Sequence, residues 1–283
     1  MTDVPTVPAG STSGERTGSS AVEPTFGQGL ILLLVYAVIV VGGQLFSGVD
    51  YDRIGASSGN VLKAIILPVG AGILAVLAIG WRWGLHSVWR EGPELRLTRP
   101  RWLVAIPALF ILTILLGVVF APWGDWSLGV VLLLLFGTLL VGFGEELMFR
   151  GFLLVGARQR YSEFGAFLLT CLLFGLVHGA NVLNGQAAGA TARQMLSAAM
   201  TGAAFYFVRR FTGVLVAAML LHGLMDFSIL VHGGPRGSAN DLTSAAATGV
   251  TATIATLFTI AAAIVVFRHA RSATPAEPPG EAT

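Results

Sequence analysis

The chain alternates between long apolar stretches and short polar connections. Each apolar stretch is close to the roughly 20 residues that a helix needs to cross a bilayer about 30 Å thick. Eight of them lie at about 28–46, 61–81, 102–121, 128–150, 164–182, 190–208, 213–232 and 248–267. The pattern predicts an all-α fold, a polytopic membrane helical bundle of about eight transmembrane helices within residues 27–270.

The two ends of the chain have a different composition. Residues 1–26 and 271–283 are rich in small and polar residues and in Pro, with few large apolar side chains. Such segments bury too little apolar surface to offset the entropy lost on ordering. We expect both to be disordered tails, and the first lacks the basic start and short apolar core of a secretory signal.

Basic residues are distributed unequally over the predicted connections. One side of the bundle would carry Arg16, Arg82, Arg90, Arg96, Arg99, Arg101, Arg158, Arg160, Arg209, Arg210, Arg268 and Arg271, and the other Arg53, Lys63, Arg193 and Arg236. Cytoplasmic loops carry the excess of Lys and Arg. We therefore expect an integral, multi-pass protein of a bacterial cell membrane with both termini cytoplasmic.

Composition supports a membrane protein and excludes other classes. Hydrophobic residues make up 54% of the chain and charged residues only 11%, against about 25% charged in soluble domains. A formal net charge of +2 lacks the basic excess of nucleic-acid-binding proteins, so no nucleic-acid partner is expected. The single Cys171 cannot form an internal disulfide.

The fourth apolar segment ends in two acids and a base, Glu145, Glu146 and Arg150. A charged residue at the centre of a membrane helix costs about 2.5–3.5 kcal/mol, so such residues face protein or a water-filled cavity. Glu146 and Arg150 are four residues apart, which predicts a structural ion pair. Glu145 is turned about 100° away and is the freer carboxylate for chemistry. Alternatively, the two acids simply mark the cytoplasmic membrane edge.

Two later segments also contain polar residues in apolar surroundings. In the fifth, His178 follows Phe174 by four residues and precedes Asn181 by three; in the seventh, His222 and Asp226 are four apart and share a helix face. A lone His on an apolar helix is usually a packing residue. Three unpaired intramembrane acids would cost about 8–10 kcal/mol, however, so we expect the polar groups to converge on one interior.

Two histidines and a carboxylate in a dry cavity suit the activation of water. A buried Glu can accept the proton of a water that attacks a peptide carbonyl, while a second group holds the oxyanion. The same residues, Glu145, His178 and His222, could alternatively bind Zn²⁺ and leave a position open for water. The helical H-E-x-x-H zinc signature is absent, so a metal is not required.

The three motifs together resemble the CAAX protease and bacteriocin-processing (CPBP, Abi) family of intramembrane endopeptidases. They are Glu145-Glu146-x-x-x-Arg150, Phe174-x-x-x-His178 and His222-x-x-x-Asp226, all within residues 141–232. The resemblance implies an eight-helix domain whose cavity opens to the cytoplasmic half of the membrane.

The resemblance also implies roles for the individual residues. Glu145 and His178 would activate water, and His222 with Asp226 would form the oxyanion or metal side. Supporting residues would be Glu146, Arg150, Phe174 and Asn181. The third motif of the family often ends in Asn, where this chain has Asp226.

The sequence therefore predicts an intramembrane endopeptidase, either a metalloprotease or a glutamate protease, acting on a membrane-associated peptide or protein near the cytoplasmic membrane face. A proton-coupled transporter could use the same Glu and His residues as a proton relay, and a non-catalytic membrane scaffold could retain them without turnover.

Overall fold

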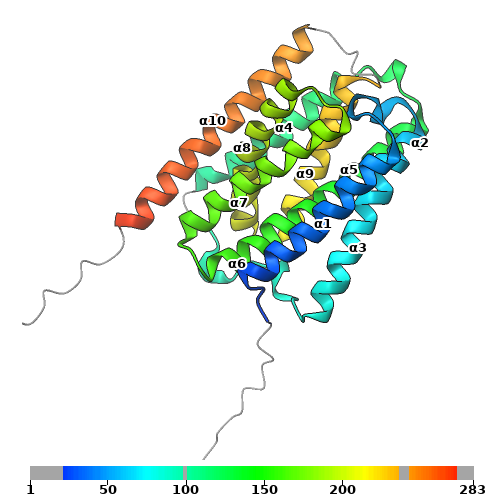
Figure 1. The fold of residues 1–283 in the computed structure, drawn as a ribbon. Helices are drawn as coiled ribbons and strands as arrows, with labels where there is room; N and C mark the ends of the chain where they lie inside the picture. The colour runs from blue at the N-terminus through cyan, green and yellow to red at the C-terminus, as the bar shows by residue number, and fades with distance from the viewer. Residues whose placement is uncertain (1–21, 98–100, 236–241, 273–283) are drawn as a thin grey trace, which may run out of the picture.

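A computed structural model describes residues 22–97, 101–235 and 242–272 (Figure 1). Nearly all of these residues are helical, and the described part of the chain contains no strand beyond one isolated antiparallel bridge between Arg90 and Val214. The predicted all-α fold is confirmed.

Eight long helical passes build the bundle, and several contain more than one type of helix. They are α1 (Phe26–Ser47); α2 (Ser58–Val61), η2 (Leu62–Ile66) and α3 (Leu67–Arg82); η5 (Arg101–Val104) and α4 (Ala105–Val119); α5 (Leu128–Glu146), η7 (Leu147–Leu153) and α6 (Leu154–Arg158); α7 (Glu163–Val177) and η8 (His178–Asn184); α8 (Ala188–Thr212); α9 (Leu215–Gly233); and α10 (Leu242–Ser272).

Seven of these passes are long and apolar enough to cross a membrane. The remaining one, α8, has 25 residues but is rich in small residues, and it packs against α7 and α9. Large apolar side chains such as Leu34, Leu74 and Leu128 are exposed on the outside of the bundle. A soluble protein rarely exposes so much apolar surface. The chain is an integral, multi-pass membrane protein, as predicted.

Helices α5 and α9 pack closely because glycines lie at their contact. A Cβ atom on Gly142 would lie 2.4 Å from the backbone oxygen of Met219, and one on Gly223 would lie 2.8 Å from the Cα of Leu139. Such distances leave room only for hydrogen. The close approach places the α9 motif beside the two acids of α5.

The fourth pass does not end where the sequence suggested. We expected it to stop at about residue 150, with Glu145 and Glu146 at or inside its end, but the helix continues through the π-helical η7 to Arg158. All seven residues of η7 are buried, including Arg150. The two acids therefore lie within the span, and the charge of Glu146 is compensated there by Arg150.

The start of the first pass also differs from the prediction. Residues 22–26 were expected to belong to the disordered tail, yet Pro24 and Val22 accept hydrogen bonds from Gln159 and Ser87 through their carbonyl oxygens. Thr25 and Gln28 form a capping box at the start of α1. The rest of both predicted tails, residues 1–21 and 273–283, lies outside the described residues.

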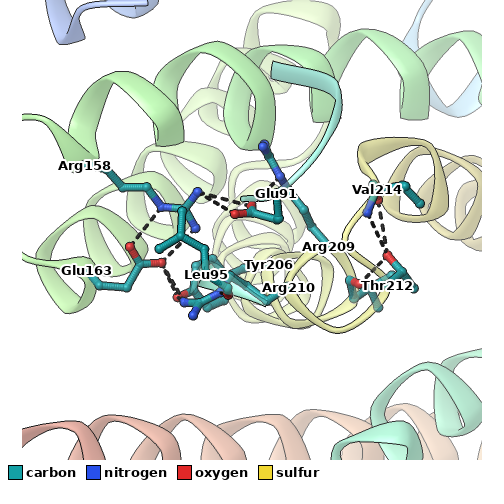
Figure 2. A network of polar contacts seen from close by, with 10 residues as sticks. Glu91, Leu95, Arg158, Glu163, Tyr206, Arg209, Arg210, Thr212 and Val214 are labelled. Carbon is teal, nitrogen blue, oxygen red and sulfur yellow. Dashed lines mark hydrogen bonds and ion pairs between the residues drawn. The ribbon is translucent and has the colours of Figure 1, made fainter. Parts of the chain in front are cut away.

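A buried ion network joins the α3–α4 connection to the rest of the bundle (Figure 2). Glu91 lies in that connection, and its carboxylate oxygens lie 2.6 Å from Arg209 Nε and 2.9 Å from Arg158 Nη1. The side chains of Glu91 and Arg209 are fully buried. This pairing could not be predicted from the sequence, because Glu91 lies in a polar loop.

Glu163 forms the second half of the network. One of its carboxylate oxygens accepts hydrogen bonds from Arg158 Nη2 at 2.8 Å, Arg210 Nη1 at 2.8 Å and the Tyr206 hydroxyl at 2.6 Å. The arginines that were interpreted only as topology signals therefore also hold α6, α7 and α8 together at one end of the bundle.

Candidate active site

A cavity of about 450 Å³ lies between α1, α5, α9 and the junction of α7 with η8. Four predicted site residues line it, namely Glu145, His178, Asn181 and Asp226. The other four, Glu146, Arg150, Phe174 and His222, are buried close to these residues. The structure thus brings the three sequence motifs together.

Glu146 and Arg150 form the ion pair that their spacing predicted. Arg150 Nη1 lies 2.7 Å from Glu146 Oε1, and the two side chains are 1% and 0% exposed. The guanidinium also lies over the Phe174 ring, with Cζ 4.4 Å from the ring centroid. A Cβ on Gly202 would come within 2.4 Å of Arg150 Nη2, so glycine is needed there.

Glu146 also contacts His222, which the sequence did not indicate. Its Oε1 lies 3.1 Å from His222 Nδ1. A carboxylate paired with an arginine is ionised and accepts hydrogen bonds, so Nδ1 carries the proton. The His222 ring is fixed further by stacking on Phe205, with centroids 4.7 Å apart and planes inclined by 20°.

The other ring nitrogen of His222 faces the two cavity acids. Nε2 lies 3.4 Å from Asp226 Oδ2 and 3.9 Å from Glu145 Oε2. Asp226 is thus within reach of His222, as their spacing on α9 predicted. His222 connects the buried Glu146–Arg150 pair to the cavity.

Glu145 has a free carboxylate oxygen. Its Oε2 is buried and has no hydrogen-bond partner among the described residues. Both histidines are close enough to interact electrostatically with this carboxylate. The hydroxyl of Tyr36, another cavity residue, is also buried without a partner in the described chain. Glu145 is therefore free to bind a molecule that enters the cavity.

His178 is oriented by the backbone of its own helix. Its Nδ1 lies 2.8 Å from the carbonyl oxygen of Phe174. Because a carbonyl oxygen can only accept, Nδ1 is the protonated nitrogen and Nε2 is left as the acceptor. The Phe174 ring packs edge-on against His178 and His222, which explains why an aromatic residue occupies this position.

Asn181 does not contact the acids but takes part in a separate polar chain. Its Nδ2 donates to Gln194 Oε1 at 2.9 Å, and Gln194 Nε2 donates to the Tyr51 hydroxyl at 3.1 Å. The sequence did not indicate that four further residues belong to the site, namely Gln194, Tyr51, Tyr36 and Phe205. No spacing pattern connects them to the motifs, so only the tertiary structure could identify them.

The donor atoms of the site do not match a zinc centre. Among the described residues, no three His, Cys, Asp or Glu side chains converge in an arrangement that could hold a metal ion. The proposed ligand set of Glu145, His178 and His222 is not such a group.

Several polar residues that line the cavity lie at one end of the bundle. Gln44 and Tyr51 come from the end of α1 and the turn after it, and Asn181 comes from η8, after α7. The Glu91 network lies at the opposite end, where α1 and α7 begin. The arginine distribution predicts that this opposite end is cytoplasmic. A cytoplasmic arginine-rich end and a cytoplasmic opening of the cavity, both predicted from the sequence, thus point to opposite ends of the bundle, and both stay predictions.

Comparison with known protein families agrees with the sequence motifs. Residues 126–228 match the family described as type II CAAX prenyl endopeptidase Rce1-like. This segment contains all eight predicted site residues. Comparison with curated proteins and with solved structures gives no match. Residues 126–228 of this membrane protein are therefore similar to the Rce1-like CAAX endopeptidases, in agreement with the resemblance carried by the three motifs.

Proposed function

We propose that the protein is an intramembrane endopeptidase in which Glu145 activates a water molecule for attack on a peptide bond. The observation that carries this proposal is the free, buried carboxylate oxygen of Glu145 in a cavity shared with His178 and Asp226. The family match supports peptide hydrolysis as the reaction class. The substrate would be a membrane-associated peptide or protein.

The reaction would begin with proton transfer from water. The Glu145 carboxylate takes one proton as the water oxygen bonds to the carbonyl carbon, and the carbonyl π electrons move to oxygen. When the tetrahedral oxyanion collapses, the C–N bond breaks and the proton on Glu145 passes to the leaving nitrogen. The products are an acid and an amine. General-base catalysis of this kind contributes about 10²–10⁴ in rate.

The two histidines would position the reacting groups. His178 Nε2, held by the Nδ1 contact to Phe174, accepts the second hydrogen of the water. His222, fixed through Nδ1 by Glu146, is directed at the position where negative charge develops. Arg150 holds the Glu146 carboxylate in position, so the buried pair acts through His222.

The proposed reaction uses no metal, in keeping with the poor fit of the donors to Zn²⁺. Dialysis against a chelator should therefore leave cleavage unchanged, with the bound metal measured in the same sample. Loss of cleavage on dialysis, restored by Zn²⁺, would contradict the metal-free reaction.

A cleavage screen in liposomes tests the function. Purified protein is incubated with peptides that carry an apolar anchor, and the fragments are identified by mass spectrometry. We expect fragments from the wild type and none from Glu145→Gln. Peptide flux that follows a pH gradient without fragments would instead indicate a transporter. If Glu145→Gln reproduced the cellular phenotype of the wild type, the protein would be a scaffold.

A further inference from the structure

Three polar side chains from separate elements form a directed chain of hydrogen bonds that ends in the cavity. Asn181 of η8 donates to Gln194 of α8, and Gln194 donates to the hydroxyl oxygen of Tyr51. Tyr51 lies in the short 3₁₀ helix η1 (Tyr51–Ala56). Because the Tyr51 oxygen accepts in this chain, its own O–H proton remains available for donation within the cavity that Tyr51 lines.

The turn that carries Tyr51 is held in place on several sides. Ile54 is buried, and Asn60 Nδ2 donates to the carbonyl oxygen of Arg53 at 2.7 Å. Gly55 lies against the Trp126 ring, where an added Cβ would be 2.9 Å from the nearest ring carbon. The indole of Trp126 is itself fixed by a 3.0 Å hydrogen bond to the carbonyl oxygen of Val231. These contacts therefore fix the position of the turn that carries Tyr51.

Burial and the nearby carboxylates keep the Tyr51 hydroxyl protonated. Removal from water raises the pKa of the Tyr51 phenol, and the carboxylates of Asp226 and Glu145 raise it further, against the opposing hydrogen bond from Gln194. A neutral phenol can donate a hydrogen bond, whereas an ionised carboxylate can only accept one. Tyr51 thus differs from its acidic neighbours in the cavity, which can only accept when they are ionised.

The site needs such a donor because of Asp226. An ionised carboxylate close to the scissile carbonyl repels the oxyanion that forms there, and Asp226 Oδ2 is already directed at His222 Nε2 at 3.4 Å. A side-chain amide at this position could donate, but an ionised Asp cannot. The neutral hydroxyl of Tyr51 lines the same cavity as Asp226 and can supply the missing donor.

From these observations we infer that the Tyr51 hydroxyl donates a hydrogen bond to the carbonyl oxygen of the scissile peptide as that oxygen becomes negative. Gln194 and Asn181 are positioning residues that hold the phenol oxygen. Tyr51 keeps its proton throughout, so the step adds no proton transfer to the hydrolysis. The inference rests on the proposed endopeptidase function and adds a catalytic residue to it.

Tyr51→Phe removes only the hydroxyl and tests the role directly. Loss of one oxyanion donor lowers kcat by about 10²–10³, and we expect this loss with KM and the melting temperature unchanged. Tyr161→Phe is the matched control, because Tyr161 is 40% exposed and lies outside the cavity. Wild-type turnover in Tyr51→Phe would overturn the inference while leaving the endopeptidase function intact. An inactive wild type would overturn both.

Two further variants separate donation from a structural role. Replacing Tyr51 with 3,5-difluorotyrosine keeps the shape but makes the phenol more acidic, so activity should be lost at a lower alkaline pH than in the wild type. Gln194→Met should lower kcat by about tenfold or less, the value of one neutral hydrogen bond, with KM unchanged. An unshifted alkaline limb in the fluorinated protein would contradict donation by Tyr51.

Discussion

Arg150 Nη1 lies 2.7 Å from Glu146 Oε1 inside a membrane-spanning pass, and both side chains are almost completely removed from solvent. Two further nitrogens of this guanidinium, Nε and Nη2, have no hydrogen-bond partner within the described chain. The charge of Arg150 thus depends on Glu146 and on the faces of neighbouring aromatic rings. The pair stabilises the site and orients His222 through the same carboxylate oxygen.

Arg150→Ala should therefore lower both stability and activity. It leaves the buried Glu146 charge uncompensated, and breaking a buried pair in this way costs about 3–5 kcal/mol. We expect a lower melting temperature in detergent than for Arg160→Ala, a control at an exposed arginine. An inactive Arg150→Ala protein that melts like the wild type would instead make Arg150 a catalytic residue.

Asp226→Asn tests how the third motif contributes. An amide can donate to an oxyanion without first being protonated, so we expect cleavage to be retained or increased. If Asp226 were needed as an acceptor that fixes His222, cleavage would fall instead. Measuring kcat and bound zinc together is decisive, because simultaneous loss of both would show that Asp226 supports a metal.

The geometry of the motifs was largely predictable, since it follows from helical spacing. Residues four apart share a helix face, which gave the Glu146–Arg150 pair and the neighbouring positions of His222 and Asp226. The length of the fourth pass was not predicted, because the apolar run ends near Arg150 and the sequence does not show that the residues of η7 are buried. Tyr51 reaches the cavity from η1 and Gln194 from α8, and no local sequence pattern predicts that they meet.

The side from which the cavity is reached can be measured by thiol labelling. If the arginine-rich end is cytoplasmic, Asp50→Cys, beside Tyr51, should react with a membrane-impermeant reagent in intact cells, and Arg160→Cys only after permeabilisation. Both positions are exposed in the structure. The buried Cys171 would be replaced with Ala in both variants. The reverse labelling pattern would place the cavity mouth in the cytoplasm and contradict the predicted orientation.

Glu91→Gln should destabilise the protein without changing its chemistry. The fully buried guanidinium of Arg209 would lose its only carboxylate contact among the described residues, and such a loss costs about 3–5 kcal/mol. We expect a lower melting temperature than for Glu94→Gln at an exposed position, with kcat per folded molecule unchanged. Equal melting temperatures would show that the network in Figure 2 contributes little to stability.

The central claim is that Glu145 is the general base, and the turnover of Glu145→Gln tests it most directly. The amide keeps the shape of the side chain but cannot accept the proton of water, so cleavage should fall by at least about 10². The melting temperature should stay at the wild-type value, because Glu145 Oε2 has no hydrogen bond to lose among the described residues. Glu94→Gln provides the exposed control. Wild-type turnover in Glu145→Gln would contradict the assignment of Glu145 as the general base.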